Sequence, residues 1–269
     1  MRPSRVTTTR PRTCRFRGSL PSLLRWQSRA VQAVVLAGGL ATRMRPRTLV
    51  VPKSLLEVAG RPFVDWQLER LAACGITDIV MCIAYLGDLL RAHVGDGGRF
   101  GVHVTWADEG PTLLGTGGAL RNALDVLAPT FLVTYGDSYL PFDYSEPLQL
   151  LRRHDDCDGV MAIFANAGKW DVSNVATDGT WVVRYEKGAD MGGRSDGGFD
   201  HIDYGATALR RNVVAALPAR QNVGLDVVQR DLARQRRLRA CVARERFFEI
   251  GSPEGLAELD RRLRAGVVP

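Results

Sequence analysis

The stretch from Val34 to Leu56, VVLAGGLATRMRPRTLVVPKSLL, constrains the fold of this chain more than any other. An apolar run ends at two glycines, Gly38 and Gly39, and a polar loop precedes the next apolar segment. This pattern predicts a buried strand and a tight loop, where backbone without a Cβ brings its N–H groups close to an anion. Arg43 and Lys53 follow Gly39 by four and fourteen residues, so these cations can close over phosphate groups. The glycine pair alone is equally consistent with a simple turn, so the interpretation depends on the whole string.

Two adjoining segments, LAGGLATRMRP and PKSLLEVAGRPFVDWQLERL, resemble the opening of the sugar-1-phosphate nucleotidyltransferases, also called NDP-sugar pyrophosphorylases. The resemblance extends from about Gln32 to Leu259 and is strongest to the bacterial branch that transfers guanylyl groups to heptose 1-phosphate and mannose 1-phosphate. It implies that Arg43 binds the departing pyrophosphate and that Lys53 binds the α-phosphate. The nucleotide-binding residues that it implies in the first loop are Leu36, Ala37, Gly38 and Gly39.

Apolar strands and amphipathic helices alternate along the following part of the chain. Residues 62–74 and 87–94 have helical spacing, whereas residues 78–86 and 101–106 are typical of strands. This alternation predicts a parallel sheet with helices on both faces, in which ligands bind beyond the carboxyl ends of the strands. We therefore expect an α/β fold, a single Rossmann-like domain over residues 31–265 with a mostly parallel mixed sheet.

Residues 1–30 differ from the rest in composition. They hold eight arginines and no acid, so 28 basic and 29 acidic side chains remain, and the net charge of +7 gives no reason to expect nucleic-acid binding. We favour a disordered extension over an organelle transit peptide, because 33 Arg against 3 Lys fits a GC-rich bacterial genome. No apolar run approaches the ~20 residues of a membrane span. Five scattered cysteines are typical of a cytoplasmic protein.

A second glycine-rich segment, Gly115–Gly118, opens a predicted helix. Backbone N–H groups at a helix N-terminus are unpaired and can approach a base or a ribose. A glycine-rich helix start without a ligand is equally consistent with this pattern. In the family this segment lines the base pocket, so the resemblance implies nucleotide-binding roles for Glu109, Gly115, Thr116 and Gly117.

Residues 130–137, TFLVTYGD, form a predicted apolar strand that ends at Asp137. A carboxylate at the carboxyl tip of a central strand is well placed to hold a metal ion over a phosphate, although Gly-Asp-Ser also suits a plain turn. Asp137 matches the family's metal-binding aspartate, and Glu249 stands where the closing motif of the family usually has Asp. The resemblance implies that Asp137 and Glu249 bind Mg²⁺.

The prediction of residues that bind the acceptor, the sugar 1-phosphate, depends on weaker sequence patterns. Glu186 and Lys187 form a pair that is usually plain surface, yet they match a Glu-Lys motif of the family. Asp203 replaces the family's asparagine, and an ionised Asp only accepts hydrogen bonds, so the accepted sugar is left open. Gly/Asp-rich residues 189–200 predict a mobile loop. The sugar-phosphate-binding residues that the resemblance implies are Asn174, Glu186, Lys187 and Asp203.

These patterns and the resemblance together predict a cytoplasmic enzyme that transfers a nucleotidyl group from an NTP to a sugar 1-phosphate. GTP with a mannose- or heptose-type 1-phosphate is the favoured pair, and neither nucleic acid nor membrane is an expected partner. Base, sugar and oligomeric state, a homo-oligomer included, are left open. One alternative is a cytidylyl- or uridylyltransferase for another acceptor such as choline phosphate, and a second is a catalytically silent nucleotide-sugar-binding regulator. A Rossmann dehydrogenase is set aside, because the pattern is GGxxxR and not GxGxxG.

Overall fold

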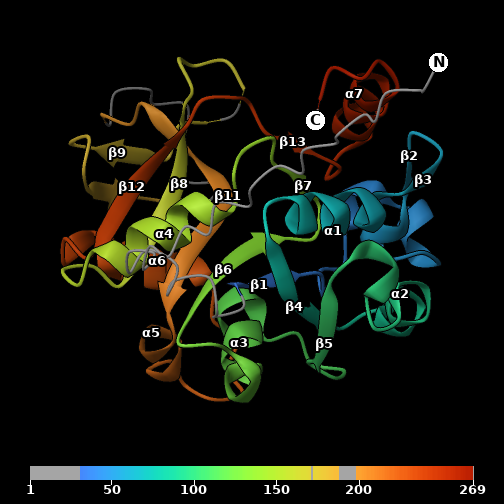
Figure 1. Ribbon diagram of the computed structural model, residues 1–269, viewed down its shortest axis with the longest axis horizontal. Helices are drawn as coiled ribbons and strands as arrows, with labels where there is room; N and C mark the ends of the chain where they lie inside the picture. The colour runs from blue at the N-terminus through green and yellow to red at the C-terminus, as the bar shows by residue number, and fades with distance from the viewer. Residues whose placement is uncertain (1–30, 171, 188–197, 269) are drawn as a thin grey trace, which may run out of the picture. The chain divides into compact units, whose positions relative to one another are not determined.

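The computed structural model describes residues 31–170, 172–187 and 198–268. The predicted extension, residues 1–30, and most of the predicted loop 189–200 lie outside these residues. A twisted central sheet has helices on both sides, as Figure 1 shows. The strands are β1 (Val31–Leu36), β2 (Glu57–Val58), β3 (Arg61–Pro62), β4 (Ile76–Ile83), β5 (His103–Asp108), β6 (Thr130–Tyr135), β7 (Ser138–Tyr139), β8 (Gly159–Ala165), β9 (Val175–Thr177), β10 (Val182–Tyr185), β11 (His201–Arg210), β12 (Leu238–Ala243) and β13 (Phe248–Glu249).

The helices match the predicted ones in position and add several more along the described chain. The α-helices are α1 (Phe63–Ala73), α2 (Gly87–Val94), α3 (Gly115–Asn122), α4 (Ser145–Arg153), α5 (Arg211–Ala215), α6 (Leu225–Arg234) and α7 (Pro253–Arg264). The 3₁₀ turns are η2 (Thr42–Met44), η3 (Arg47–Leu49), η4 (Lys53–Leu55), η5 (Gly98–Phe100) and η6 (Leu124–Val126). Within residues 31–170, 172–187 and 198–268, none of these helices has the length and apolar character needed to cross a membrane.

The main sheet has the order β10-β9-β11-β6-β1-β4-β5, and β8 and β12 extend it from β11. β1 is parallel to both of its neighbours, β4 and β6, and β4 is parallel to β5. β11 is antiparallel to β6 and β8, whereas β12 is parallel to β8. The predicted mixed sheet is confirmed, with its parallel part centred on β1 and its antiparallel part centred on β11.

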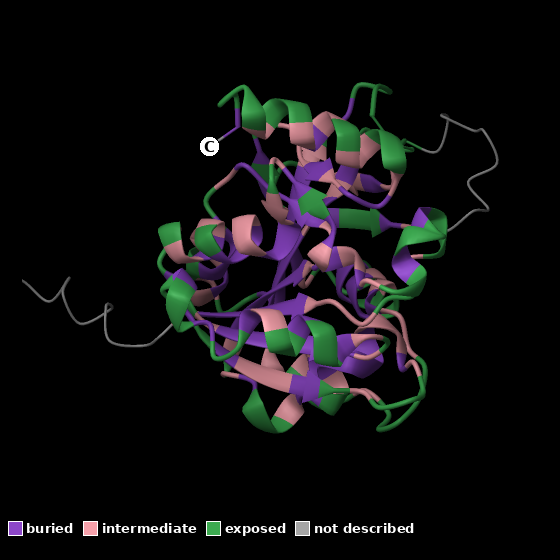
Figure 2. Ribbon diagram, turned by 90° about the vertical axis from the view of Figure 1, so that its right-hand side faces the viewer, coloured by how far each residue is buried: buried purple, intermediate pink, exposed green. Residues whose placement is uncertain are grey.

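Alternating side chains of β1 divide the core into two layers. Ala33 and Val35 pack with apolar residues of α1, α2 and α4, whereas Val34 packs with those of α3, α5 and α6. All three β1 residues are fully buried, as expected for a strand covered on both faces. The buried strands lie between helices whose outer sides are exposed (Figure 2), so the predicted helices on both faces are confirmed.

The last helix, α7, covers a separate small core. Leu259 of α7 packs with Phe248 of β13 and Tyr139 of β7. The Ser252 hydroxyl accepts a hydrogen bond from the Gly255 N–H at 3.0 Å, and Pro253 follows as the first helical residue. Ser252 is therefore the N-cap of α7, and it fixes the start of this helix shortly after Glu249.

Strand β11 contains a bulge near Gly205. Its register against β8 shifts between Asp203 and Thr207. Gly205 has a φ of 88°, a left-handed conformation that favours glycine, and its N–H donates to Asp203 Oδ1 at 2.9 Å. The bulge separates the part of β11 that pairs with β6 from the part that carries Asp203.

We expect Ser252→Ala to lower the free energy of unfolding by about 1 kcal/mol, because it removes the hydroxyl that caps α7. Urea denaturation of both proteins measures the difference. Ser145→Ala is the control, since that hydroxyl only accepts a side-chain hydrogen bond from Gln149 at the surface. An equal effect of the two substitutions would contradict a specific role for the cap.

Candidate active site

The carboxyl ends of β1 and β6 bring two predicted loops side by side. Leu36 pairs with Tyr135 at the last position of the parallel ladder, and the Gly136 N–H donates to the Leu36 carbonyl at 2.9 Å. The chain beyond Leu36 is therefore held against Gly136 and the residue that follows it, Asp137. This is the edge of the sheet at which the sequence places a ligand.

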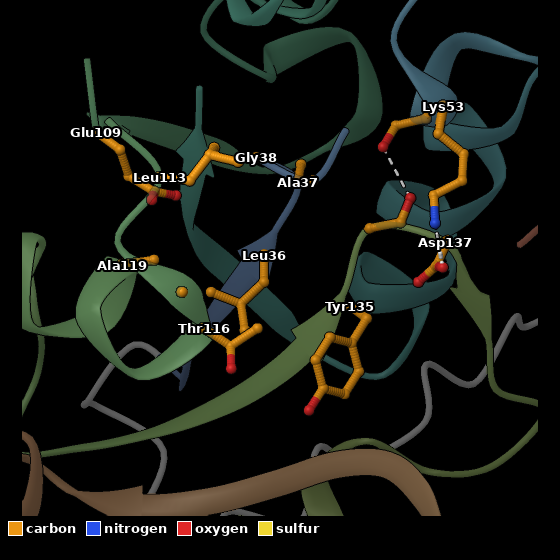
Figure 3. Close-up of a pocket in the computed structure, with 14 residues that line it drawn as sticks. Leu36, Ala37, Gly38, Lys53, Glu109, Leu113, Thr116, Ala119, Tyr135 and Asp137 are labelled. Carbon is orange, nitrogen blue, oxygen red and sulfur yellow. Dashed lines mark hydrogen bonds and ion pairs between the residues drawn. The ribbon is translucent and has the colours of Figure 1, made fainter. Parts of the chain in front are cut away.

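Three 3₁₀ turns, η2, η3 and η4, return the chain from the glycine loop to the same strand ends. The Ser54 hydroxyl in η4 donates to the Gly136 carbonyl at 2.7 Å. This buried hydrogen bond fixes η4 over the end of β6, and the neighbouring side chain, Lys53, forms an ion pair with Asp137 (Figure 3). The structure thus joins two of the residues to which the resemblance assigns chemistry.

A cavity of about 230 Å³ opens beside this ion pair. In Figure 3, Glu109 and Thr116 lie toward one end of it, and Lys53 and Asp137 lie toward the other. The lining residues are Leu36, Ala37, Gly38, Gly39, Lys53, Ser54, Glu109, Leu113, Gly115, Thr116, Ala119, Tyr135, Gly136 and Asp137. Seven of the eight predicted nucleotide-binding residues therefore share one cavity.

The eighth, Gly117, is not among the lining residues. Its N–H donates to the Val223 carbonyl at 2.8 Å, and a Cβ on it would stand 3.1 Å from the carbonyl oxygens of Val223 and Gly224. Gly117 therefore allows α3 to pack closely against the segment before α6. The Thr116 hydroxyl also faces this segment and accepts a hydrogen bond from the Leu225 N–H at 2.8 Å.

Glu109 joins the glycine loop to the start of α3. Its Oε2 accepts a hydrogen bond from the Leu114 N–H at 3.0 Å, and its Oε1 would lie 2.7 Å from a Cβ on Gly38. Burial raises the pKa of Glu109 above its usual value, although the Leu114 hydrogen bond opposes this shift. A carboxylate in this position can accept hydrogen bonds from N–H groups of a ligand in the cavity.

The second predicted carboxylate, Glu249, reaches the site through the short pairing of β13 with β7. Glu249 pairs with Ser138, and the Ile250 N–H donates to the Asp137 carbonyl at 2.9 Å. A Cβ on Gly251 would stand 3.4 Å from Glu249 Oε2 and 3.5 Å from Asp137 Oδ2. It would also lie 3.0 Å from Arg43 Nη2. Two carboxylates and a guanidinium therefore converge on a space that exists because residue 251 has no side chain.

The residues predicted to bind the sugar phosphate lie around Asp203. Its N–H donates to Asn174 Oδ1 at 2.9 Å, and its Oδ2 accepts a hydrogen bond from the Tyr185 hydroxyl at 3.0 Å. Lys187 Nζ lies 3.4 Å from the hydroxyl oxygen of Tyr135, which also lines the cavity. Burial raises the pKa of Tyr135 to about 12, so its hydroxyl stays neutral at physiological pH.

Glu186 does not join this group through its side chain. Arg184 donates to Glu186 Oε1 from Nε at 2.9 Å and from Nη2 at 2.7 Å, on an exposed part of the surface. Its backbone N–H does contribute, because it donates to the Asn174 carbonyl at 3.0 Å. Sequence reasoning missed Tyr135 and Tyr185, and the only available signal was that each aromatic ends a strand beside a predicted site residue.

Comparison with known proteins agrees with this geometry. The family model for nucleotidyl transferases matches residues 32–169, about half of the chain. The chain belongs to the nucleotidyl transferase family. The chain is 39% identical over 120 residues to N-acetylmuramate alpha-1-phosphate uridylyltransferase of Neisseria meningitidis serogroup B, and the match covers 44% of this chain and 52% of that protein. It is 32% identical over 199 residues to mannose-1-phosphate guanylyltransferase of Mycobacterium tuberculosis, covering 73% of this chain and 53% of that protein.

The chain spans about half the length of the curated relatives it matches. Among solved structures, HddC from Yersinia pseudotuberculosis complexed with GMP-PN superposes with a TM-score of 0.68. The two sequences are 24% identical, and the match covers 87% of this chain and 99% of HddC. This likeness confirms the fold that the sequence predicts.

We expect Gly38→Ala to lower the free energy of unfolding by about 1–3 kcal/mol, because the new Cβ would overlap Glu109 Oε1 and press on Ala84. Gly39→Ala is the matched control, since a Cβ there would meet nothing within 4 Å. Urea denaturation of the two variants tests this difference. If both variants are as stable as the wild type, the close packing of Glu109 on Gly38 is incorrect.

The raised pKa of Glu109 predicts a pH-dependent effect of Glu109→Gln. The folded state binds this proton more tightly than the unfolded state, so the wild type loses stability as pH rises from the unfolded to the folded pKa. Glu109→Gln has no such titration and should not lose this stability. The variant should therefore exceed the wild type in unfolding free energy most at pH 8, and the excess should vanish below the usual carboxyl pKa. Denaturation curves at pH 8 and pH 4 measure it, and an equal difference at both would contradict the shift.

Proposed function

We propose that this protein transfers a nucleotidyl group from an NTP to a sugar 1-phosphate and releases pyrophosphate. The observation that carries the proposal is the Lys53–Asp137 ion pair at one end of a cavity whose other end contains Glu109. Arg43 and Glu249 approach the same Asp137 carboxylate at Gly251. Cations and carboxylates at the phosphate end, beside side-chain-free backbone, suit a reaction between two polyanions. The names of the curated relatives support the same class of reaction.

The proposed reaction needs no protein nucleophile. An oxygen of the sugar 1-phosphate, already ionised at neutral pH, forms a bond to the α-phosphorus while the bond to the bridging oxygen breaks and pyrophosphate leaves. Catalysis then consists of positioning and of neutralising charge. In this proposal Lys53 binds the α-phosphate and Arg43 the pyrophosphate, while the N–H groups of Gly38 and Gly39 contact the phosphate chain.

The proposed acceptor site adjoins the cavity at Tyr135, which Lys187 contacts. Lys187 would bind the phosphate of the sugar, because it is a cation beside the cavity-lining hydroxyl of Tyr135. Asn174 and Asp203 would bind sugar hydroxyls, since they are hydrogen-bonded to each other at this edge. We include Glu186 in the acceptor site as well, and binding there would require its carboxylate to exchange Arg184 for a sugar hydroxyl.

Mg²⁺ is the proposed cofactor, with Asp137 and Glu249 as its protein ligands. No group of three or more His, Cys, Asp or Glu residues in the described chain forms a metal site by itself. Two carboxylates whose oxygens approach the same point at Gly251 still fit a Mg²⁺ ion that takes its remaining oxygen ligands from water and substrate phosphates. When bound, the ion would neutralise charge on the reacting phosphates.

GTP with a mannose- or heptose-type 1-phosphate is the proposed substrate pair, and the proposed location is the cytoplasm of a bacterium. The mannose-1-phosphate guanylyltransferase relative supports this pair, and Glu109 can accept hydrogen bonds from the N–H groups of guanine. A uridylyltransferase is the second candidate, since another relative carries that name. The base is therefore the first property to measure.

The experiment that tests the function is pyrophosphate release by the full chain. Four NTPs are each combined with mannose, heptose, glucose and N-acetylhexosamine 1-phosphates and with choline phosphate, with Mg²⁺ or with a chelator. We expect a Mg²⁺-dependent signal with GTP and one of the first two sugars. Turnover of choline phosphate alone would favour the alternative acceptor, and nucleotide binding without turnover of any pair would favour the silent regulator.

Asp137→Ala should reduce the rate of the reacting pair by roughly a thousandfold, because it removes a proposed ligand of the ion that neutralises the phosphates. Asp155→Ala is the control, since Asp155 is fully exposed and pairs only with Arg210 among the described residues. The rate of pyrophosphate release measures both variants. Near-normal turnover of Asp137→Ala would remove Asp137 from the mechanism.

A further inference from the structure

Lys53 and Asp137 form an ion pair at the place where the proposed reaction needs a metal ion. The two side chains are 20% and 19% exposed, so water screens the pair only in part. The backbone of η4 positions the lysine, because the Ser54 hydroxyl holds this turn on the Gly136 carbonyl. The contact therefore follows from the packing of η4 on the end of β6, and its position is set by buried groups.

The oxygen that Lys53 occupies is the one that faces the second carboxylate. Lys53 Nζ binds Asp137 Oδ2, and the same oxygen would lie 3.5 Å from a Cβ on Gly251. Glu249 Oε2 stands 3.4 Å from that point and Arg43 Nη2 stands 3.0 Å from it. Two carboxylates and two protein cations thus share this space. Their formal charges cancel without a metal ion.

We propose that Lys53 takes the place of the divalent cation on Asp137 in the nucleotide-free protein. A bare carboxylate oxygen attracts Mg²⁺, whereas one that already binds an ammonium must lose that partner first. The proposal rests on the proposed function, since it assumes that Asp137 is a metal ligand. It adds a positioning role for Lys53 that precedes its contact with the α-phosphate.

In this proposal, a bound nucleotide attracts Lys53 away from Asp137. A triphosphate bound along Ala37–Gly39 brings several negative charges next to the lysine, which has a long, flexible side chain and binds phosphate as a point charge. When Lys53 turns to the phosphate, Asp137 Oδ2 becomes available to the metal ion. The metal ion therefore enters with the nucleotide, and each ligand raises the affinity of the protein for the other.

Titration of the nucleotide-free full chain with Mn²⁺, followed by the electron paramagnetic resonance of the free ion, tests this role. Lys53→Met removes the ammonium but keeps the length of the side chain. We expect it to bind Mn²⁺ about tenfold or more tightly than the wild type, because removal of a charge-assisted bond frees the oxygen. Adding Asp137→Asn to Lys53→Met should abolish the gain.

Lys187→Met is the matched control for charge. It removes one positive charge from beside the cavity, as Lys53→Met does. Lys187, however, contacts Tyr135 and neither of the proposed metal ligands, Asp137 and Glu249. We expect the Mn²⁺ affinity of Lys187→Met to stay within about twofold of the wild type. An equal gain in Lys187→Met and Lys53→Met would overturn the proposal, because general electrostatics would then explain both.

The temperature of thermal unfolding provides a second readout, which does not depend on enzymatic activity. Mg²⁺ should stabilise the wild type only when an NTP is present, whereas it should stabilise Lys53→Met without nucleotide. If Lys53→Met does not fold, Lys53→Gln replaces it in both measurements. Tight Mn²⁺ binding by the nucleotide-free wild type would overturn the role of Lys53. If no NTP and acceptor pair releases pyrophosphate, the proposed function is overturned. The metal-binding measurements would still be valid, because they do not depend on turnover.

Discussion

The site depends on the parallel pairing of β1 with β6. These strands end at the same level, Leu36 opposite Tyr135, and the hydrogen bond from the Gly136 N–H to Leu36 closes the ladder. One strand contributes the glycine loop and the other contributes Asp137. Neither end can shift by one residue without moving side chains from one face of the sheet to the other. The distance between the glycine loop and the Asp137 carboxylate is therefore set by the core of the sheet.

Charge balance is the second constraint on this arrangement. Two carboxylates, Asp137 and Glu249, and the Arg43 guanidinium meet at Gly251, and Lys53 pairs with Asp137, so four separate segments of the chain contribute. In the absence of ligands they neutralise one another, which allows them to be partly buried at moderate cost. Substrates of the proposed reaction replace these protein–protein contacts with protein–phosphate contacts. The same side chains can then stabilise both the free protein and the complex.

The sequence predicted the fold class and the strand that ends at Asp137, because apolar runs and glycine positions are local signals. It could not predict that Glu186 binds Arg184 or that Gly117 faces Val223. The first contact depends on the conformation of the chain at the end of β10, and the second depends on the packing of α6 beside α3. Neither is encoded in a local sequence pattern. Tyr135 was missed for a similar reason. Its role follows from its orientation toward Lys187, a residue far along the chain.

The bulge at Gly205 divides β11 into two segments with different pairing. The segment after it pairs with β6, the strand that leads to Asp137, whereas the segment before it carries Asp203. Because the register shift lies between them, side chains near Asp203 can change without altering the β6 pairing. If Asp203 binds the acceptor as proposed, substitutions in the first segment alone could alter acceptor preference. The proposed nucleotide end would then keep its geometry.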